Sequence, residues 1–419
     1  MSLEQIGQQA KKAARKLALV STTAKNDALE KMADRLGEQA ETILAANQED
    51  LEQARQAGLS PAMIDRLMLN EARLTNIVSD LRKVCELPDP AGEVFDEQIL
   101  PNGLRVHKQR VPLGVLGVIY EARPNVTVDV AGLALKSGNC AILRGGSETI
   151  HSNQALVSAI RQALAESDLP VDTIQLIPSP DRRLVLELLQ MEDYVDMIIP
   201  RGGAGLHELC RQNSRIPVMT GGIGICHLFV DDSADLVAAL PVIRNAKIQR
   251  PSVCNALDTV LVHRKVASAF IPQLAEVLTK DGVTFRVDPL VEEILGQRYA
   301  GAVRPAGPQD FDIEWLSLIL GIKVVEGLEE AVEHIAAHST GHSDGILTED
   351  EENARRFIAE VDSAVVYVNA STRFTDGAQL GLGAEVAIST QRLHARGPMA
   401  LRELTTYKWV VEGNYHIRP

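Results

Sequence analysis

The most constraining feature of this sequence is a regular alternation of short apolar runs with helical stretches, which begins near residue 113. The apolar runs lie at 113–120, 140–143, 173–177, 195–199 and 227–230, and the helical stretches between them lie near 126–137, 150–165, 181–191 and 204–213. Runs that are apolar at consecutive positions are typical of strands buried on both faces. Their alternation with helices predicts a parallel sheet covered by helices.

A second unit of the same kind follows the first. Its expected helices lie at 233–246, 266–279 and 328–337, and its expected strands at 259–262, 322–325 and 365–368. Two such units in one chain predict two parallel α/β domains with a cleft between them. The first 90 residues instead carry apolar residues at helical spacing. Thr22 or Thr23 is expected to cap one of these helices, and Ser60 before Pro61 another.

Two segments have the pattern of β-hairpins. Strands are expected at 95–100 and 104–111, on either side of Asn102 and Gly103, and Asn-Gly is a strong local hairpin signal. A second hairpin is expected in the tail, from strands at 407–411 and 415–417. Because so short a hairpin is marginal alone, we expect the tail to pack on another subunit.

Composition limits the classes of partner. With 42 Lys and Arg against 56 Asp and Glu, the formal charge is −14, which disfavours binding to nucleic acid or to an anionic membrane surface. An anionic ligand would therefore need a local basic cluster. The longest uncharged apolar stretch, 111–120, is about half the length of a spanning helix, so we expect no membrane segment. No signal-peptide pattern is present, which predicts a cytoplasmic protein.

Five cysteines, without a CxxC pair or histidines at ligand spacing, predict reduced thiols and neither a disulfide framework nor a metal site. Cys85, Cys140 and Cys210 lie within helical or strand patterns and are interpreted as core residues. Cys226 precedes His227, but neighbouring side chains on a strand point to opposite faces, which argues against a Cys–His pair.

Cys254 differs from the other four because it lies in a loop between an expected helix and an expected strand. Lys247 and Arg250 are close in sequence, and nearby cations lower a thiol pKa from its usual value of about 8.5. Local chemistry leaves two interpretations open, a nucleophile and a core thiol.

Glycine-rich segments at 199–205 and 144–147 each follow an expected strand. Backbone N–H groups at a helix start can bind phosphate there, although glycines also serve ordinary tight turns. No GxGxxG fingerprint follows a strand, which disfavours a standard Rossmann site. Three arginines in expected loops, Arg123, Arg373 and Arg396, are either solvated charges or clamps for carboxylate and phosphate.

Together these stretches resemble the aldehyde dehydrogenase superfamily over essentially the whole chain. The superfamily pattern is matched at 112–119 (PLGVLGVI), 138–144 (GNCAILR), 245–254 and 367–369, and more specific stretches are 120–129 (YEARPNVTVD), 199–206 (IPRGGAGL), 249–255 (QRPSVCN), 368–376 (VNASTRFTD) and 393–398 (LHARGP). The likeness is greatest to the branch that reduces the acyl phosphate of glutamate in proline biosynthesis.

The resemblance implies an aldehyde-dehydrogenase-like α/β fold with a division into three parts. A cofactor-binding domain would comprise 1–97, 112–225 and 362–384, and a catalytic domain 226–361. An oligomerisation element would comprise 98–111 and 385–419. The implied assembly is a homo-oligomer, with a transient contact to the glutamate 5-kinase that makes the acyl phosphate.

The resemblance also implies roles for individual residues. Cys254 matches the nucleophile, and Asn125 is similar to the asparagine that holds the oxyanion, although the spacing before it is longer by two residues and Arg123 could take that place. The substrate's carboxylate and phosphate would be bound by Arg123, Arg373 and Arg396. The cofactor would be bound by Arg144, Ser147, Gly202, Gly203 and Glu314.

One departure from the family pattern concerns water activation. Hydrolytic members carry a glutamate where this chain has Met219, and methionine cannot accept a proton. The implied activity is the NADPH-dependent reduction of L-glutamyl 5-phosphate to L-glutamate 5-semialdehyde with release of phosphate, through a cysteine thioester and a thiohemiacetal. The alternatives are a hydrolytic dehydrogenase, a cysteine acyltransferase without cofactor, and a non-catalytic interaction protein.

Overall fold

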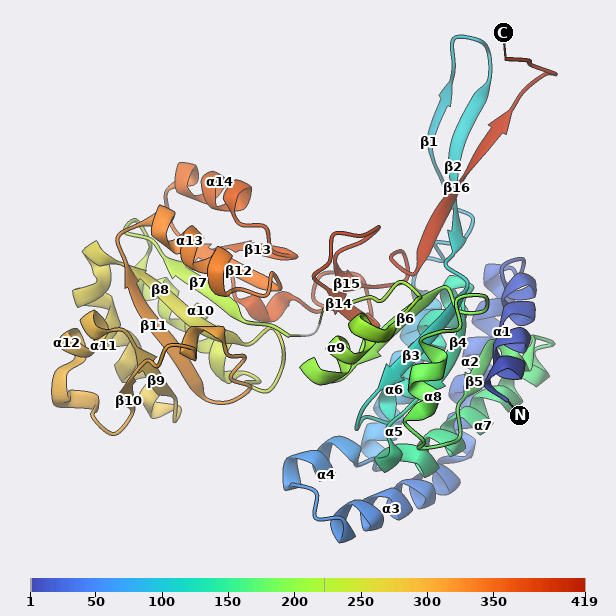
Figure 1. The fold of residues 1–419 in the computed structure, drawn as a ribbon, viewed down its shortest axis with the longest axis horizontal. Helices are drawn as coiled ribbons and strands as arrows, with labels where there is room; N and C mark the ends of the chain where they lie inside the picture. Colours follow the sequence, from blue (N-terminus) through green and yellow to red (C-terminus); the bar gives the residue numbers. More distant parts are fainter. Residues whose placement is uncertain (1, 222, 419) are drawn as a thin grey trace. The chain divides into compact units, whose positions relative to one another are not determined.

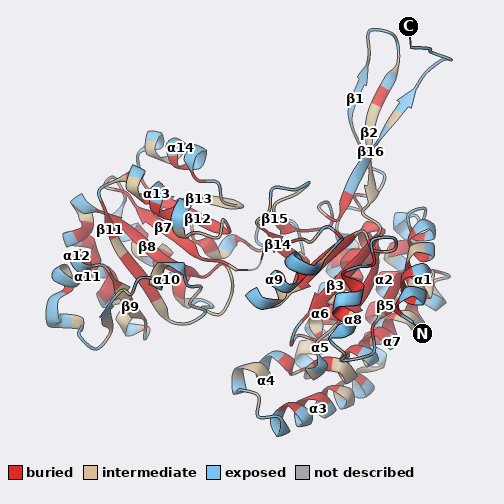
Figure 2. Cartoon of the chain, viewed as in Figure 1, coloured by how far each residue is buried: buried red, intermediate tan, exposed pale blue. Residues whose placement is uncertain are grey.

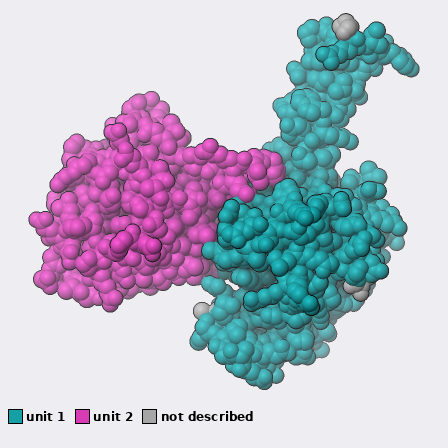
Figure 3. All heavy atoms as spheres, viewed as in Figure 1, with its two compact units in different colours: residues 1–220, 381–387, 399–419 teal, residues 221–380, 388–398 magenta. Residues whose placement is uncertain are grey.

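The computed structural model describes residues 2–221 and 223–418, and the chain forms two compact units (Figures 1 and 3). Unit 1 comprises Met1–Thr220, Gly381–Ala387 and Met399–Pro419, and unit 2 comprises Gly221–Leu380 and Ile388–Pro398. Each contains a parallel sheet, as the alternation of apolar runs and helices predicts. Among the described residues, no helix is both long enough and apolar enough to cross a bilayer.

The sheet of unit 1 has four parallel strands in the order β5-β4-β3-β6. They are β3 (Val115–Tyr120), β4 (Cys140–Arg144), β5 (Ile174–Leu176) and β6 (Met197–Arg201). Every residue of β3 and β4 is buried, because helices cover both faces of the sheet (Figure 2). Val218, which the sequence places near a strand, forms only an isolated bridge to Ile198.

The helices of unit 1 include those expected in the first 90 residues. They are α1 (Leu3–Leu17), α2 (Thr22–Glu38), α3 (Ala40–Gln56), α4 (Pro61–Leu67), α5 (Glu71–Glu86), α6 (Asn125–Ser137), α7 (Ile150–Glu166), α8 (Arg183–Leu188) and α9 (Ala204–Asn213). Ser60 caps α4, as expected. The expected cap of α2 is wrong: Ser21 is extended and accepts from the Ala24 N–H, whereas Thr22 is already helical.

A three-stranded antiparallel sheet extends beyond the rest of unit 1 (Figure 1). The predicted hairpin is confirmed, with β1 (Val94–Ile99) paired to β2 (Arg105–Pro112). The predicted tail hairpin is wrong. β16 (Thr405–Glu412) pairs with β2 over eight residues, because β2 offers a complete edge, and 415–417 forms no strand.

The sheet of unit 2 has seven parallel strands in the order β10-β9-β11-β8-β7-β12-β13. They are β7 (Cys226–Val230), β8 (Leu257–His263), β9 (Thr284–Val287), β10 (Val303–Pro305), β11 (Ile319–Val325), β12 (Ser343–Leu347) and β13 (Val365–Val368). The helices are α10 (Leu236–Ile248), α11 (Arg264–Lys280), α12 (Pro289–Leu295), α13 (Leu328–His338) and α14 (Glu351–Glu360). The sequence did not predict β9, β10 and β12.

The two compact units are divided at other positions than the expected domains. Residues 362–380, which the resemblance groups with the cofactor-binding domain, lie in unit 2, where β13 pairs with β12. β1 belongs wholly to the three-stranded sheet, whereas the expected boundary at residue 98 divides it. Two short paired strands, β14 (Ala387–Ser389) and β15 (Gly397–Met399), lie where the backbone passes between the units. The roles of the units and the cleft remain predictions.

Candidate functional site

Cys254 lies in the short connection between α10 and β8. Lys247, in the last turn of α10, is fully buried and donates from Nζ to the carbonyl of Leu257, 2.8 Å away. Its Nζ also lies 3.7 Å from the Asp258 carboxylate, whose burial raises the pKa of Asp258 to about 7. Lys247 is thus paired with a buried carboxylate. Of the two cations that lie close to Cys254 in sequence, this leaves Arg250.

The backbone of Cys254 is packed tightly. The Cys226 thiol donates to the Cys254 carbonyl at 3.3 Å, and a Cβ placed on Gly224 would overlap that same carbonyl oxygen. His227 instead contacts Asp344, 2.9 Å from Nδ1, which confirms that Cys226 and His227 point to opposite faces of β7. The Cys254 side chain itself is half-buried.

A second segment, from the end of β13 onward, is hydrogen-bonded to the Cys254 loop. The Asn255 side-chain amide donates to the carbonyls of Arg373, at 3.3 Å, and Thr375, at 2.9 Å. The Thr372 hydroxyl donates in return to the Asn255 carbonyl at 2.7 Å. Two stretches that the sequence marks separately, 249–255 and 368–376, therefore form one structure.

Arg373 is the cation that these hydrogen bonds hold next to the Cys254 loop. Its Nε donates to the Gln249 side chain at 3.0 Å, which turns the guanidinium toward the loop. Burial and the neighbouring Arg250 lower the pKa of Arg373, whereas its attraction to Cys254 and to Asp376 raises it. Arginine remains charged at neutral pH, so a cation lies next to the loop that carries the Cys254 thiol.

Glu314 binds the backbone of Gly224, the residue that packs against the Cys254 carbonyl. Its carboxylate accepts the Gly224 N–H at 2.9 Å, and its burial raises the pKa of Glu314. Arg396, in contrast, donates from both terminal nitrogens to Asp362, at 2.7 Å each. The structure thus brings Glu314 and Arg373 to the Cys254 loop, while Arg396 is held by an acidic partner.

Asn125 and Arg123 lie in unit 1, in the turn that joins β3 to α6. Ala122 adopts a left-handed backbone (φ 50°), and its N–H donates to Glu148 at 2.9 Å. Such strain is typical of functional turns. Asn125 is the first residue of α6, and its side-chain amide donates to the Asp129 carboxylate at 2.9 Å. Asp129 has no role predicted from the sequence, although its spacing of four residues from Asn125 is visible there.

A small recess lies at the carboxyl ends of β4 and β5, where ligands of α/β sheets bind. It is lined by Gly145, Gly146, Ile150, Asn153, Leu176, Ile177, Ser179 and Pro180. Arg144 donates to the carbonyls of Gly145 and Pro180, while its buried Nε has no partner among the described residues. Ser147 is exposed beside it. Glycines, a hydroxyl and an unpaired guanidinium nitrogen fit the ribose or phosphate of a nucleotide.

Gly202 and Gly203 join β6 to α9. The N–H of Gly203, just before the helix, donates to the Glu121 carboxylate at 3.3 Å. A carboxylate thus accepts the hydrogen bond that an anionic ligand would accept at this helix start. Met219, which replaces the water-activating glutamate, is buried, and its N–H donates to Ile198 at 2.8 Å. Gly222, in the same motif, lies outside the described residues.

Comparisons with known proteins agree with this geometry. Residues 1–292 match the model of the aldehyde dehydrogenase family. Gamma-glutamyl phosphate reductase of Aeromonas salmonicida is 58% identical over 419 residues, which cover 100% of both chains. The crystal structure of gamma-glutamyl phosphate reductase from Thermotoga maritima has a TM-score of 0.97 and 49% identity, again covering 100% of both chains. An engineered glycolyl-CoA reductase with bound NADP+ shares the fold (TM-score 0.69, 17% identity, covering 98% and 96%).

Alkylation tests the distinct environment of Cys254. Burial raises the pKa to about 11 for Cys85 and Cys210 and to about 12 for Cys140, and it also raises the pKa of Cys226. Each of these thiols is therefore almost entirely protonated at pH 7.5. We expect iodoacetamide at this pH to modify Cys254 at least about tenfold faster than the other four, as followed by peptide mass spectrometry. Faster labelling of any other cysteine would contradict the assignment.

Proposed function

Because the chain is an oxidoreductase of the aldehyde dehydrogenase family, and within it belongs to the gamma-glutamyl phosphate reductases, we propose that it reduces L-glutamyl 5-phosphate to L-glutamate 5-semialdehyde with NADPH, releasing phosphate, in proline biosynthesis. The observation that carries the proposal is the set of hydrogen bonds that joins the Arg373 segment to the loop of Cys254, through Gln249 and Asn255. An acyl phosphate needs both a nucleophile for its carbon and a cation for its charge.

The reaction begins with attack of the Cys254 thiolate on the γ-acyl carbon. The C–S bond forms as the C–O bond to phosphate breaks, and phosphate leaves with both electrons of that bond. Arg373 offsets the charge on the departing group. The oxyanion of the tetrahedral intermediate is stabilised by the Cys254 N–H and the Asn125 amide, each worth about 3 kcal/mol. The product of this step is a thioester on Cys254.

When bound, NADPH would supply the hydride for reduction of this thioester to a thiohemiacetal. Arg144, Ser147, Gly202, Gly203 and Glu314 would bind it, with the recess beside Arg144 for the adenosine end. The positive charge of Arg144 favours the additional phosphate of NADPH. The engineered glycolyl-CoA reductase of the same fold was solved with NADP+. Collapse of the thiohemiacetal then releases the aldehyde and restores the thiolate.

The absence of a base at residue 219 protects the thioester from water. Met219 is buried and cannot accept a proton, so nothing at this position activates a water molecule. A thioester that is not hydrolysed persists until it is reduced. This feature favours reduction of an acyl phosphate over the alternative of a hydrolytic dehydrogenase.

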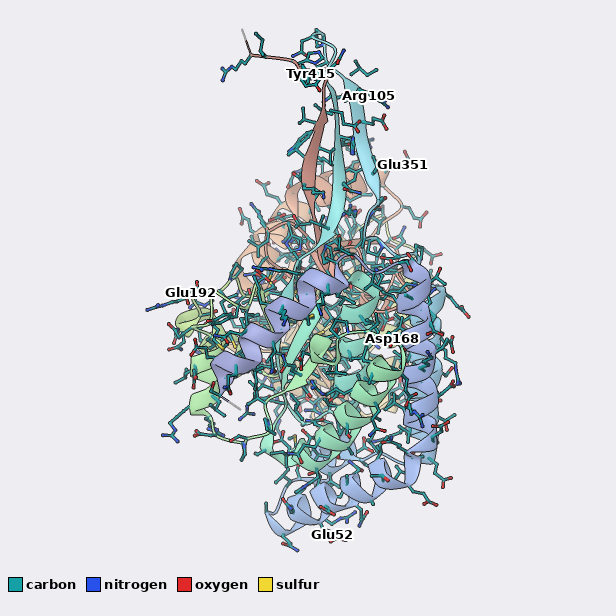
Figure 4. The ribbon with its side chains drawn as sticks, turned by 90° about the vertical axis from the view of Figure 1, so that its right-hand side faces the viewer. Glu52, Arg105, Asp168, Glu192, Glu351 and Tyr415 are labelled. Atoms are coloured by element: carbon teal, nitrogen blue, oxygen red, sulfur yellow. The ribbon has the colours of Figure 1, made fainter. Side chains whose placement is uncertain are left out.

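The three-stranded sheet supports a homo-oligomer. Tyr407, Trp409 and Val411 alternate along β16, so they share one face, and each is about half exposed (46–58%). Lys108 of β2 lies over the Trp409 ring, 5.0 Å from its centroid. Figure 4 shows Arg105 at the outer end of this sheet, with Tyr415 beyond the end of β16. A stripe of large apolar side chains on an extended sheet is typical of a protein interface, and we propose that a second copy covers it.

The direction of the reaction can be tested by oxidising L-glutamate 5-semialdehyde. We expect NADP+ reduction, followed at 340 nm, to require inorganic phosphate, because phosphate must release the acyl group from Cys254. Cys254→Ser should lower the rate at least about a thousandfold, whereas Cys85→Ser should retain it. Oxidation that proceeds equally well without phosphate would identify a hydrolytic dehydrogenase.

Replacement of Arg373 by alanine tests the substrate cation. We expect Arg373→Ala to raise the KM for the acyl phosphate about tenfold or more and to leave the KM for NADPH nearly unchanged. Arg356→Ala is the matched control, because Arg356 forms an ion pair with Glu360 on the surface of α14. A larger effect on NADPH than on the acyl phosphate would assign Arg373 to the cofactor.

The exposed stripe on β16 can be tested by a single charge. We expect Trp409→Glu to convert the oligomer to smaller species in sedimentation velocity at micromolar concentration, because a carboxylate cannot be buried there unpaired. Lys408→Glu introduces the same group on the opposite face of β16 and should leave the assembly intact. Equal behaviour of both variants, or a monomeric parent protein, would overturn the proposed interface.

A further inference from the structure

Asp129 and Asn125 form a hydrogen-bonded pair along one side of α6. They are four residues apart, so their side chains meet one turn along the helix. The Asn125 Nδ2 lies 2.9 Å from the Asp129 Oδ2, and within the described part of the chain this is the one side-chain hydrogen bond that Asn125 makes. The second Nδ2 hydrogen is therefore available to another acceptor.

A side-chain amide can present either its oxygen or its nitrogen in a given direction, since a half-turn about the terminal bond exchanges them. A carboxylate only accepts hydrogen bonds, so the ionised Asp129 selects the orientation in which Nδ2 faces it. The carbonyl oxygen of Asn125 is thereby turned to the other side. A neutral partner at residue 129 that can donate would not impose this choice.

We propose that Asp129 is a positioning residue, which fixes the orientation of the Asn125 amide and so leaves its second N–H as the oxyanion donor of the proposed reaction. The inference rests on the proposed function, since it takes Asn125 as the oxyanion donor. Asp129 acts only through Asn125 and touches no reacting atom. Pre-orientation of a donor matters because the oxyanion is stabilised by dipoles that need no reorganisation during the reaction.

Burial and the charged groups around Asp129 give its carboxyl a pKa that lies within the pH range of an activity assay. Burial raises the pKa of Asp129 to about 6, against the lowering effects of the Asn125 amide and of Arg201 on β6, while Asp80 on α5 raises it further. His207 on α9 stays neutral there, because burial and Arg201 lower its pKa to about 4. Above pH 6 the carboxylate accepts from Nδ2. Below pH 6 the protonated carboxyl can donate to the Asn125 oxygen and reverse the amide, so kcat falls as the pH is lowered.

The test is a double-mutant cycle of Asp129→Leu and Asn125→Ala, measured on acyl phosphate reduction by the full-length protein. We expect Asp129→Leu to lower kcat about tenfold with both KM values within about twofold, and to have no further effect in the Asn125→Ala protein. Equal losses in both backgrounds would show that Asp129 acts independently of Asn125 and would overturn the proposal.

Asp129→Asn supplies a second measurement, which stands even if the leucine variant does not fold. It removes both the charge and the titration, and its amide can donate as well as accept, so we expect kcat at pH 7.5 to fall about threefold to tenfold and to show no further decline near pH 6. An acid limb that persists unchanged in Asp129→Asn would contradict the proposal. A parent enzyme that does not reduce the acyl phosphate at all would instead refute the proposed function.

The chain offers a matched control for the leucine substitution. Gln48 and Glu52 on α3 form the same amide–carboxylate pair at the same spacing, 3.2 Å apart and exposed. Figure 4 labels Glu52 at the outer end of unit 1. We expect Glu52→Leu to leave kcat and its pH profile unchanged, which separates loss of a helical pair in general from loss of this one.

Discussion

The hydrogen bonds of one buried side chain, Asn255, hold the candidate site of unit 2 together. Its amide spans the carbonyls of Arg373 and Thr375, and its own carbonyl accepts from Thr372. Buried backbone carbonyls must be satisfied, so the two segments cannot separate without leaving several polar groups unpaired. The position of the Arg373 guanidinium beside the Cys254 loop depends on these hydrogen bonds. The proposed recognition of an anionic substrate therefore depends on them too.

An acidic protein can bind an anion because the electric field at a binding site depends mainly on the charges closest to it. The formal charge of −14 is spread over the whole chain, whereas Arg250 and Arg373 are neighbours at the Cys254 loop. Coulomb energy falls with distance, and salt screens exposed charges that lie more than about 10 Å apart. Two nearby guanidiniums can therefore outweigh many remote carboxylates. The net charge disfavours extended polyanions as partners but does not prevent the binding of a single phosphate group.

The sequence predicts those elements whose residues reveal their surroundings. β3 is apolar throughout and β7 is apolar except for His227, and both were expected. β12 begins Ser-Asp-Gly and was not expected, because its Asp344 is buried through hydrogen bonds to His227 and to two serines. The motifs around Cys254 and Arg373 were likewise visible separately. The contact between these two motifs could not be predicted, because Asn255 donates to backbone carbonyls. Every residue has a backbone carbonyl, so the sequence does not reveal which ones are bound. The proposed role of Asp129 depends on its hydrogen bond to Asn125, which the structure shows and the sequence does not.

The pairing of β16 with β2 has a consequence for synthesis of the chain. Arg110 and Thr405, which meet in this sheet, are 295 positions apart, and residues of unit 2 lie between them in sequence. While the ribosome is translating that stretch, β1 and β2 have emerged but one edge of β2 has no neighbour. An open strand edge is a template for unwanted association. The nascent protein thus exposes an unpaired strand edge until β16 leaves the exit tunnel, and the formation of so distant a contact slows the folding of the three-stranded sheet.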